Sequence, residues 1–88
     1  MKYVTLNLLG ENSIILFPKA IAHKEIVEAV RFMKVENGRG QWSRAYVDLD
    51  IVSAGFVDYA GNCHGESISL DVQSRPVEDT ELLRSQYD

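Results

Sequence analysis

The sequence predicts an α+β fold of order ββαββα: a four-stranded, mainly antiparallel sheet, one main helix packed on a face, and a short C-terminal helix. Apolar and polar residues alternate with a period of two in residues 3–9, 45–51 and 67–72, as in half-buried strands. Apolar residues recur at helical spacing in residues 23–34. Residues 58–62 contain the Gly and Asn that suit the positive φ angles of a hairpin turn.

Size and composition indicate a single domain, residues 1–88, with one modest core. The net charge of −4 argues against general nucleic-acid binding, which needs a basic face. No stretch approaches the roughly 20 apolar residues that span a membrane, and residues 1–7 lack the continuous apolar core of a signal peptide. Because the single cysteine cannot form an internal disulfide, we expect a cytoplasmic protein.

The first two strands should pair as a hairpin. In residues 3–9 we expect one set of side chains to face the core (Val4, Leu6 and Leu8) and the other set to face away (Tyr3, Thr5 and Asn7). Residues 10–13 have the composition of a turn. Residues 14–17 form a continuous apolar run, which predicts a strand buried on both faces or central in the sheet, and Pro18 ends it.

The main helix is expected over residues 23–34, where an apolar stripe includes Val27, Val30 and Met33. Residues 35–44 follow as a long irregular loop, because Gly38 and Gly40 interrupt the helix. A third strand over 45–57 changes phase midway, which predicts either a β-bulge near Ile51 and Val52 or a strand covered on both sides.

The fourth strand carries Ile68, Leu70 and Val72 on one face, and the short helix covers residues 77–87. Its first turn holds Glu78, Asp79 and Glu81, where the helix dipole favours negative charge, and Leu82 and Leu83 should dock it. The sheet face opposite the main helix would carry Tyr3 and Thr5, and it is too apolar to stay exposed. A second layer must therefore come from the terminal helix, from the 35–44 loop, or from another copy of the chain.

Cys63 and His64 invite comparison with a nucleophile and its base. Neighbours on a strand point to opposite faces, so we expect Cys63 to be a buried or edge thiol instead. The second histidine, His23, comes from a distant segment, and nothing has the spacing of metal ligands. We therefore expect no metal and no cofactor.

Asp48 and Asp50 share a strand face at a separation of roughly 7 Å, which would suit a cation or a general acid–base pair. A solvated strand face explains the two carboxylates more simply. The hypothesis of an enzyme that uses Cys63, His64 or the two aspartates is therefore the least favoured, and we expect a protein without catalytic activity.

Arg39, Trp42 and Arg44 are the favoured contact residues, because two guanidinium groups and an indole in one loop match the composition of an interface hot spot. The same groups could grip an anion. The sequence thus favours a small non-enzymatic protein-interaction module that self-associates as a homodimer or binds another protein. The alternative is a regulatory domain that binds a small molecule or an anion between the 35–44 loop and the central hairpin.

The start of the main helix generates a prediction. Residues 22–25 resemble a capping box whose first residue is Ala22 where Ser or Thr is usual. Ala22→Ser should therefore raise the free energy of unfolding by about 0.5–1 kcal/mol, since a hydroxyl would accept a hydrogen bond from the first turn. Thermal melting measures the change, and no gain would place the helix start elsewhere.

Overall fold

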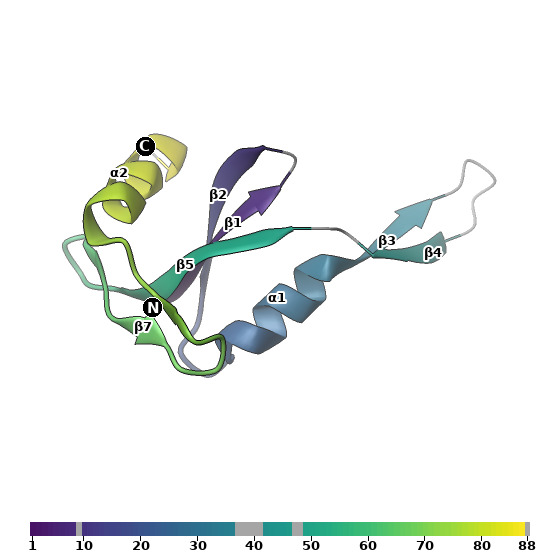
Figure 1. Ribbon diagram of the computed structural model, residues 1–88, viewed down its shortest axis with the longest axis horizontal. Coiled ribbons are helices and arrows are strands. Elements are labelled where there is room, and N and C mark those ends of the chain that lie inside the picture. Colours follow the sequence, from purple (N-terminus) through teal and green to yellow (C-terminus); the bar gives the residue numbers. More distant parts are fainter. Residues whose placement is uncertain (9, 37–41, 47–48, 88) are drawn as a thin grey trace.

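A four-stranded antiparallel sheet organises the chain, with its strands in the order β2-β1-β5-β6 (Figure 1). The computed structural model describes the backbone of residues 1–8, 10–36, 42–46 and 49–87, and the side chains of residues 1–7, 10–31 and 49–87. The strands are β1 (Lys2–Leu8), β2 (Glu11–Phe17), β5 (Asp50–Val57) and β6 (Cys63–His64). The expected α+β class and the first hairpin are confirmed.

Two helices and two small hairpins complete the described part of the chain. The helices are α1 (His23–Arg31) and α2 (Pro76–Tyr87). One hairpin pairs β3 (Phe32–Glu36) with β4 (Trp42–Tyr46), and the other pairs β7 (Glu66–Ser67) with β8 (Val72–Gln73).

Strand β1 has a core on each of its faces. On one face, Val4 and Leu6 pack with Val27 of α1. On the other, Tyr3 packs with Leu83 of α2. The terminal helix is therefore the second layer that the apolar sheet face required, and the predicted docking of α2 through its leucines is confirmed.

The predicted bulge in the third strand is present. Thr5 pairs with Ser53, whereas the next residue, Leu6, pairs with Ile51, so Val52 is the extra residue. The bulge shifts the phase of β5, which lets Ile51 and Ala54 pack in the core beneath α1 although they are three residues apart. One strand thereby serves both cores.

The segment between α1 and β5 differs from the prediction. The helix ends at Arg31 instead of Lys34, and Met33 lies in β3. Residues 35–44 are not one irregular loop, because their described ends belong to β3 and β4. The expected strand over 45–57 is likewise two strands, β4 and β5. The helical and strand periodicities coincide at Met33, so the pattern alone did not separate them.

The expected fourth strand is a turn. Residues 68–71 connect β7 to β8, with the hydroxyl of Ser67 accepting a hydrogen bond from the N–H of Leu70. Asp71 has a φ of 54°, and Ile68 is 90 % exposed. A side-chain hydroxyl that bonds nearby backbone competes with strand pairing, which explains the difference. The two-residue strand β6 takes the fourth place in the sheet. Strand β2 lies at an edge instead of the centre, but its apolar residues pack in both cores, as the alternative prediction of a strand buried on both faces required.

The β3–β4 hairpin extends away from the rest of the protein (Figure 1). The molecule measures 45 × 27 × 21 Å, and its radius of gyration is 14.1 Å. A compact domain of this length would have a radius of about 12 Å. A lone two-stranded hairpin is marginally stable in water.

Candidate functional site

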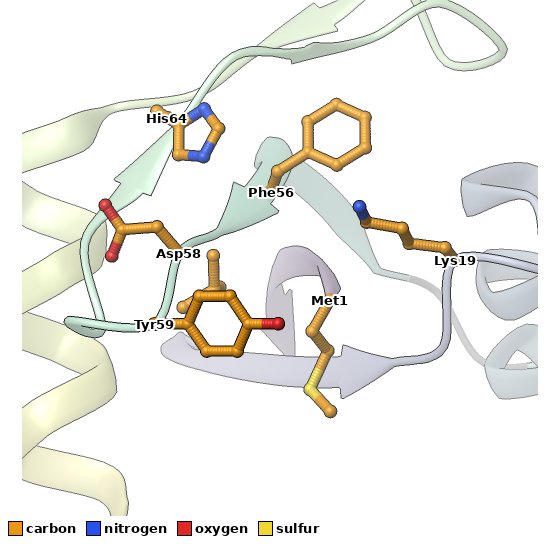
Figure 2. A pocket seen from close by; sticks show the side chains of 7 residues that line it. Met1, Lys19, Phe56, Asp58, Tyr59 and His64 are labelled. Atoms are coloured by element: carbon orange, nitrogen blue, oxygen red, sulfur yellow. The ribbon is translucent and has the colours of Figure 1, made fainter.

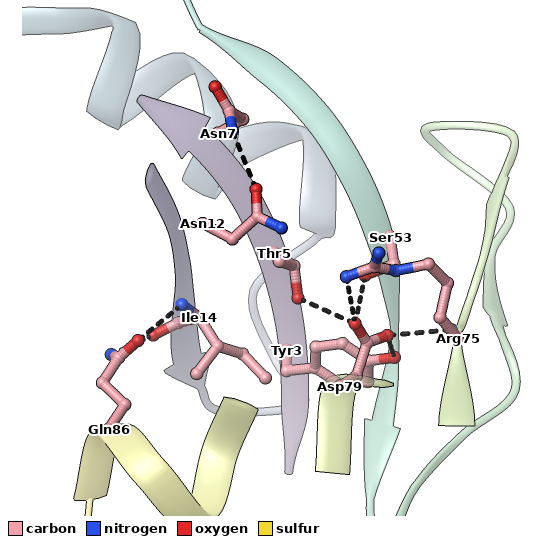
Figure 3. A network of polar contacts seen from close by, with 9 residues as sticks. All are labelled: Tyr3, Thr5, Asn7, Asn12, Ile14, Ser53, Arg75, Asp79 and Gln86. Carbon is pink, nitrogen blue, oxygen red and sulfur yellow. Dashed lines mark hydrogen bonds and ion pairs between the residues drawn. The ribbon is translucent and has the colours of Figure 1, made fainter. Parts of the chain in front are cut away.

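A buried carboxylate, that of Asp79 in the first turn of α2, joins the helix to the sheet (Figure 3). Its Oδ2 accepts hydrogen bonds from the hydroxyl of Tyr3 at 2.5 Å and from the backbone N–H of Arg75 at 2.8 Å. Its Oδ1 accepts from the hydroxyl of Ser53 at 2.7 Å and from the guanidinium of Arg75 at 3.1 Å. The hydroxyl of Thr5 makes a longer contact at 3.4 Å.

These donors determine the charge state of the network. Burial alone would raise the pKa of Asp79, but the hydrogen bonds from Tyr3, Arg75 and Ser53 outweigh it and hold the pKa below its usual value. Burial, followed by the bond to the carboxylate, raises the pKa of Tyr3 well above its usual value. At neutral pH the network therefore consists of an ionised Asp79 and a protonated Tyr3.

The Asp79 network holds α2 against β1 and β5. It leaves no place for a ligand, since Asp79 is fully buried and both of its carboxylate oxygens accept hydrogen bonds from the protein. Sequence reasoning placed Asp79 in the first turn of a helix but attributed it only to the helix dipole. The available signal was the alternation that places Tyr3 and Thr5 on one sheet face, whereas Ser53 joins them only through the register of β1 with β5.

Cys63 and His64 lie on opposite faces of β6, as strand geometry predicted. Cys63 is buried in the core beneath α2, where burial raises the pKa of its thiol. His64 is exposed on the other face and stacks on Phe56, its partner across the ladder, with ring centroids 6.1 Å apart. The thiol and the imidazole therefore do not form a nucleophile–base pair.

Phe56 lies at the centre of a line of rings that reaches the surface. The buried ring of His23 meets Phe56 edge-on at 6.0 Å and Phe17 edge-on at 5.1 Å. His23 also makes a hydrogen bond of 3.0 Å from Nε2 to the carbonyl of Gly55. His23 is thus a core residue, whereas the exposed His64 presents its imidazole to solvent.

Two open pockets adjoin Phe56 and His64, the first of which is shown in Figure 2. One, of about 680 Å³, is also lined by Met1, Lys19, Val57, Asp58 and Tyr59. The other, of about 700 Å³, is also lined by residues that include Lys2, Glu66 and Ile68. Tyr59 is fully exposed, and Met1 is 54 % exposed. We call the surface formed by Met1, Lys2, Lys19, Phe56, Asp58, Tyr59, His64, Glu66 and Ile68 the Phe56–His64 surface.

The aspartates have separate roles. Asp50 is exposed at the start of β5, while Asp48 lies outside the described residues, so their pairing stays a prediction. Asp58 accepts hydrogen bonds from the backbone N–H groups of Ala60 and Asn62, which fix the predicted hairpin turn. The bond from Asn62 is the main cause that lowers the pKa of Asp58.

Two of the three predicted contact residues, Trp42 and Arg44, lie in β4 of the projecting hairpin. Trp42 pairs with Glu36 in the β3–β4 ladder, and Arg44 pairs with Lys34. The side chains of both, and all of Arg39, lie outside the described residues. Their role as contact residues stays a prediction.

Within the described ranges, no group of three or more His, Cys, Asp and Glu side chains is arranged to hold a metal ion. Over the same part of the chain, no helix combines the length and the apolar character needed to cross a membrane.

The Asp79 network generates a pH-dependent prediction. Asp79→Asn should lower the free energy of unfolding at neutral pH by about 1–3 kcal/mol, because it leaves buried donors without a charged acceptor. A lowered native pKa stabilises the fold above the unfolded-state pKa, about 3.9, and this contribution is lost as the pH falls through the native pKa. The difference between variant and wild type should therefore shrink in acid.

Urea denaturation at about pH 7 and about pH 3 measures both values. Asp50→Asn is the matched control, since Asp50 is exposed, and it should change stability by less than about 0.5 kcal/mol. An equal cost of Asp79→Asn at both pH values would show that its charge does not stabilise the fold.

Comparison with known proteins finds no matching family model, no matching curated protein and no matching solved structure.

Proposed function

We propose that the protein is a non-enzymatic interaction module that self-associates through the Phe56–His64 surface. The observation that supports this is the placement of exposed apolar side chains beside open, largely apolar pockets. Tyr59 protrudes at the rim of one pocket and Ile68 at the rim of the other. Exposed apolar side chains grouped around such pockets are typical of interaction sites.

A second copy of the chain fits this surface because the surface is self-complementary. It offers both protruding side chains and hollows, so a two-fold axis can place Tyr59 or Ile68 of each copy in a pocket of the other. It also offers both signs of charge, with Lys19 and Asp58 lining the same pocket. Opposite charges at the rim favour a defined orientation of the two copies.

The expected affinity is modest. Full burial of a large apolar side chain contributes roughly 1.5–3 kcal/mol, and the symmetric interface would bury one or both of Tyr59 and Ile68 from each copy. Association costs at least about 4 kcal/mol in lost freedom of motion. The balance favours a dimer that forms at raised protein concentration, which suits a reversible module.

We place the protein in the cytoplasm because its single cysteine is a free, buried thiol.

Loss of a protruding side chain tests the proposal. Tyr59→Ser should weaken self-association about tenfold or more, since it removes apolar area from both halves of the interface. Sedimentation velocity over a concentration series measures the effect, with circular dichroism to confirm folding. Val77→Ser is the matched control, because Val77 is 65 % exposed and does not line either pocket. Equal association of Tyr59→Ser and wild type would remove this surface from the proposal.

The β3–β4 hairpin is the competing contact surface. If Arg39, Trp42 and Arg44 make the contact, Trp42→Ala or Arg44→Ala should weaken association without unfolding the protein, since hot spots concentrate binding energy in Trp and Arg. The same sedimentation series compares these variants with Tyr59→Ser. Normal assembly by both hairpin variants would assign the contact elsewhere.

A second candidate function is the binding of a small anionic molecule in the pocket between Lys19 and His64. The pocket volume of about 680 Å³ falls within the range of ligand sites, and Lys19 supplies a cation at its rim (Figure 2). Native mass spectrometry of gently purified protein separates the two functions. A dimer mass supports self-association, whereas a monomer that carries a few hundred extra daltons would support the ligand.

A further inference from the structure

Strand β2 forms one edge of the four-stranded sheet, at the opposite side from β6. An edge strand presents backbone N–H and C=O groups that another strand can pair with. Residues 14–17 of β2 are all apolar, and Glu11 at its start is its one charged residue. Long, uncharged edges of this kind are prone to pair with other chains.

The C-terminal end of α2 covers this edge at one residue, Ile14 (Figure 3). The backbone N–H of Ile14 donates to Oε1 of Gln86 at 2.9 Å, and Nε2 of Gln86 donates to the carbonyl of Ile14 at 2.8 Å. The hydroxyl of Tyr87 donates to the same carbonyl at 3.2 Å. The amide of Gln86 thus makes the pair of bonds that a peptide group of a neighbouring strand would make.

The remaining groups on this edge follow from strand geometry. Successive residues of an antiparallel strand direct their backbone groups to opposite sides. Ile14 directs its groups away from β1 and toward Gln86, so Asn12 and Leu16 direct theirs to the same outer side. The covered position therefore lies midway along a row of three that a neighbouring strand would use.

We propose that Gln86 and Tyr87 form a latch on the outer edge of β2, and that release of the latch lets a second copy of the chain add its β2 antiparallel to this edge. The partner is a second copy because two identical edges pair about a two-fold axis, with Ile14 facing Ile14 and Asn12 facing Leu16. The charged residue of each strand, Glu11, then lies at the end of the paired region, away from its counterpart.

This inference is independent of the proposed function, because it concerns the opposite edge of the sheet and backbone pairing. The test separates the two by carrying Tyr59→Ser in every protein, which weakens the apolar contact equally in all of them. In this background, Gln86→Ala should shift the sedimentation profile from monomer to dimer at a concentration at least about tenfold lower than for the parent. Gln73→Ala, which changes an exposed glutamine on β8, is the matched control and should leave the profile unchanged.

A suppressor variant tests the geometry. Asn12→Pro removes an outward N–H from the edge and leaves the ladder to β1 intact, because Asn12 directs its N–H away from β1. Adding Asn12→Pro to Gln86→Ala should therefore restore the monomer. Hydrogen exchange should also show that the backbone amides of Asn12 and Leu16 are protected in the Gln86→Ala dimer. This protection should be lost when dilution dissociates the dimer.

Two results would overturn the latch: a folded Gln86→Ala protein that stays monomeric, or a dimer that Asn12→Pro leaves intact. Should Gln86→Ala lose its circular dichroism signal, Gln86→Met decides, because it keeps the length and helix propensity of the side chain but has no amide to bond Ile14 N–H or Ile14 C=O. A dimer of Gln86→Met supports the latch, and a monomer contradicts it.

Discussion

The carboxylate of Asp79 is the interaction on which the two-layered core depends. A buried charge is costly unless nearly every lone pair is occupied, and Asp79 meets this condition with donors from β1, β5 and the residue before α2. Those donors fix the position and direction of the helix. Leu82 and Leu83 then cover the sheet face that carries Tyr3. Apolar packing and the hydrogen bonds to Asp79 therefore hold α2 on the same face of the sheet.

The features that the sequence predicted correctly are those encoded by neighbouring residues. The first hairpin, the turn at Asp58 and the bulge at Val52 each follow from a local pattern of apolar, glycine or proline residues. The predictions failed where two local patterns compete. Met33 satisfies both the helical and the strand period, and the hydroxyl of Ser67 bonds the backbone of Leu70 and forms a turn where alternation predicted a strand.

The candidate site depends on the register with which strands pair, and the pattern of apolar and polar residues within one strand does not determine that register. The alternation of side chains along a strand correctly predicted that Cys63 and His64 lie on opposite faces of β6. The stacking of His64 on Phe56 and the pockets beside them arise from the pairing of β5 with β6 and from the turn that exposes Tyr59. The burial of Asp79 likewise depends on Tyr3, which lies 76 residues away in the sequence. Such long-range pairings were beyond the reach of periodicity.

The contact between β1 and α2 also constrains the order in which the protein can fold during synthesis. Strand β1 is synthesised before α2, the helix that covers one of its faces. Until α2 has been made, the hydroxyl of Tyr3 has no buried carboxylate to bond, and its ring is exposed to solvent. Contacts of such high sequence separation form slowly, because a long loop must close before they are made. We therefore expect the face of β1 that carries Tyr3 to be covered late in folding and to be an exposed apolar surface until then.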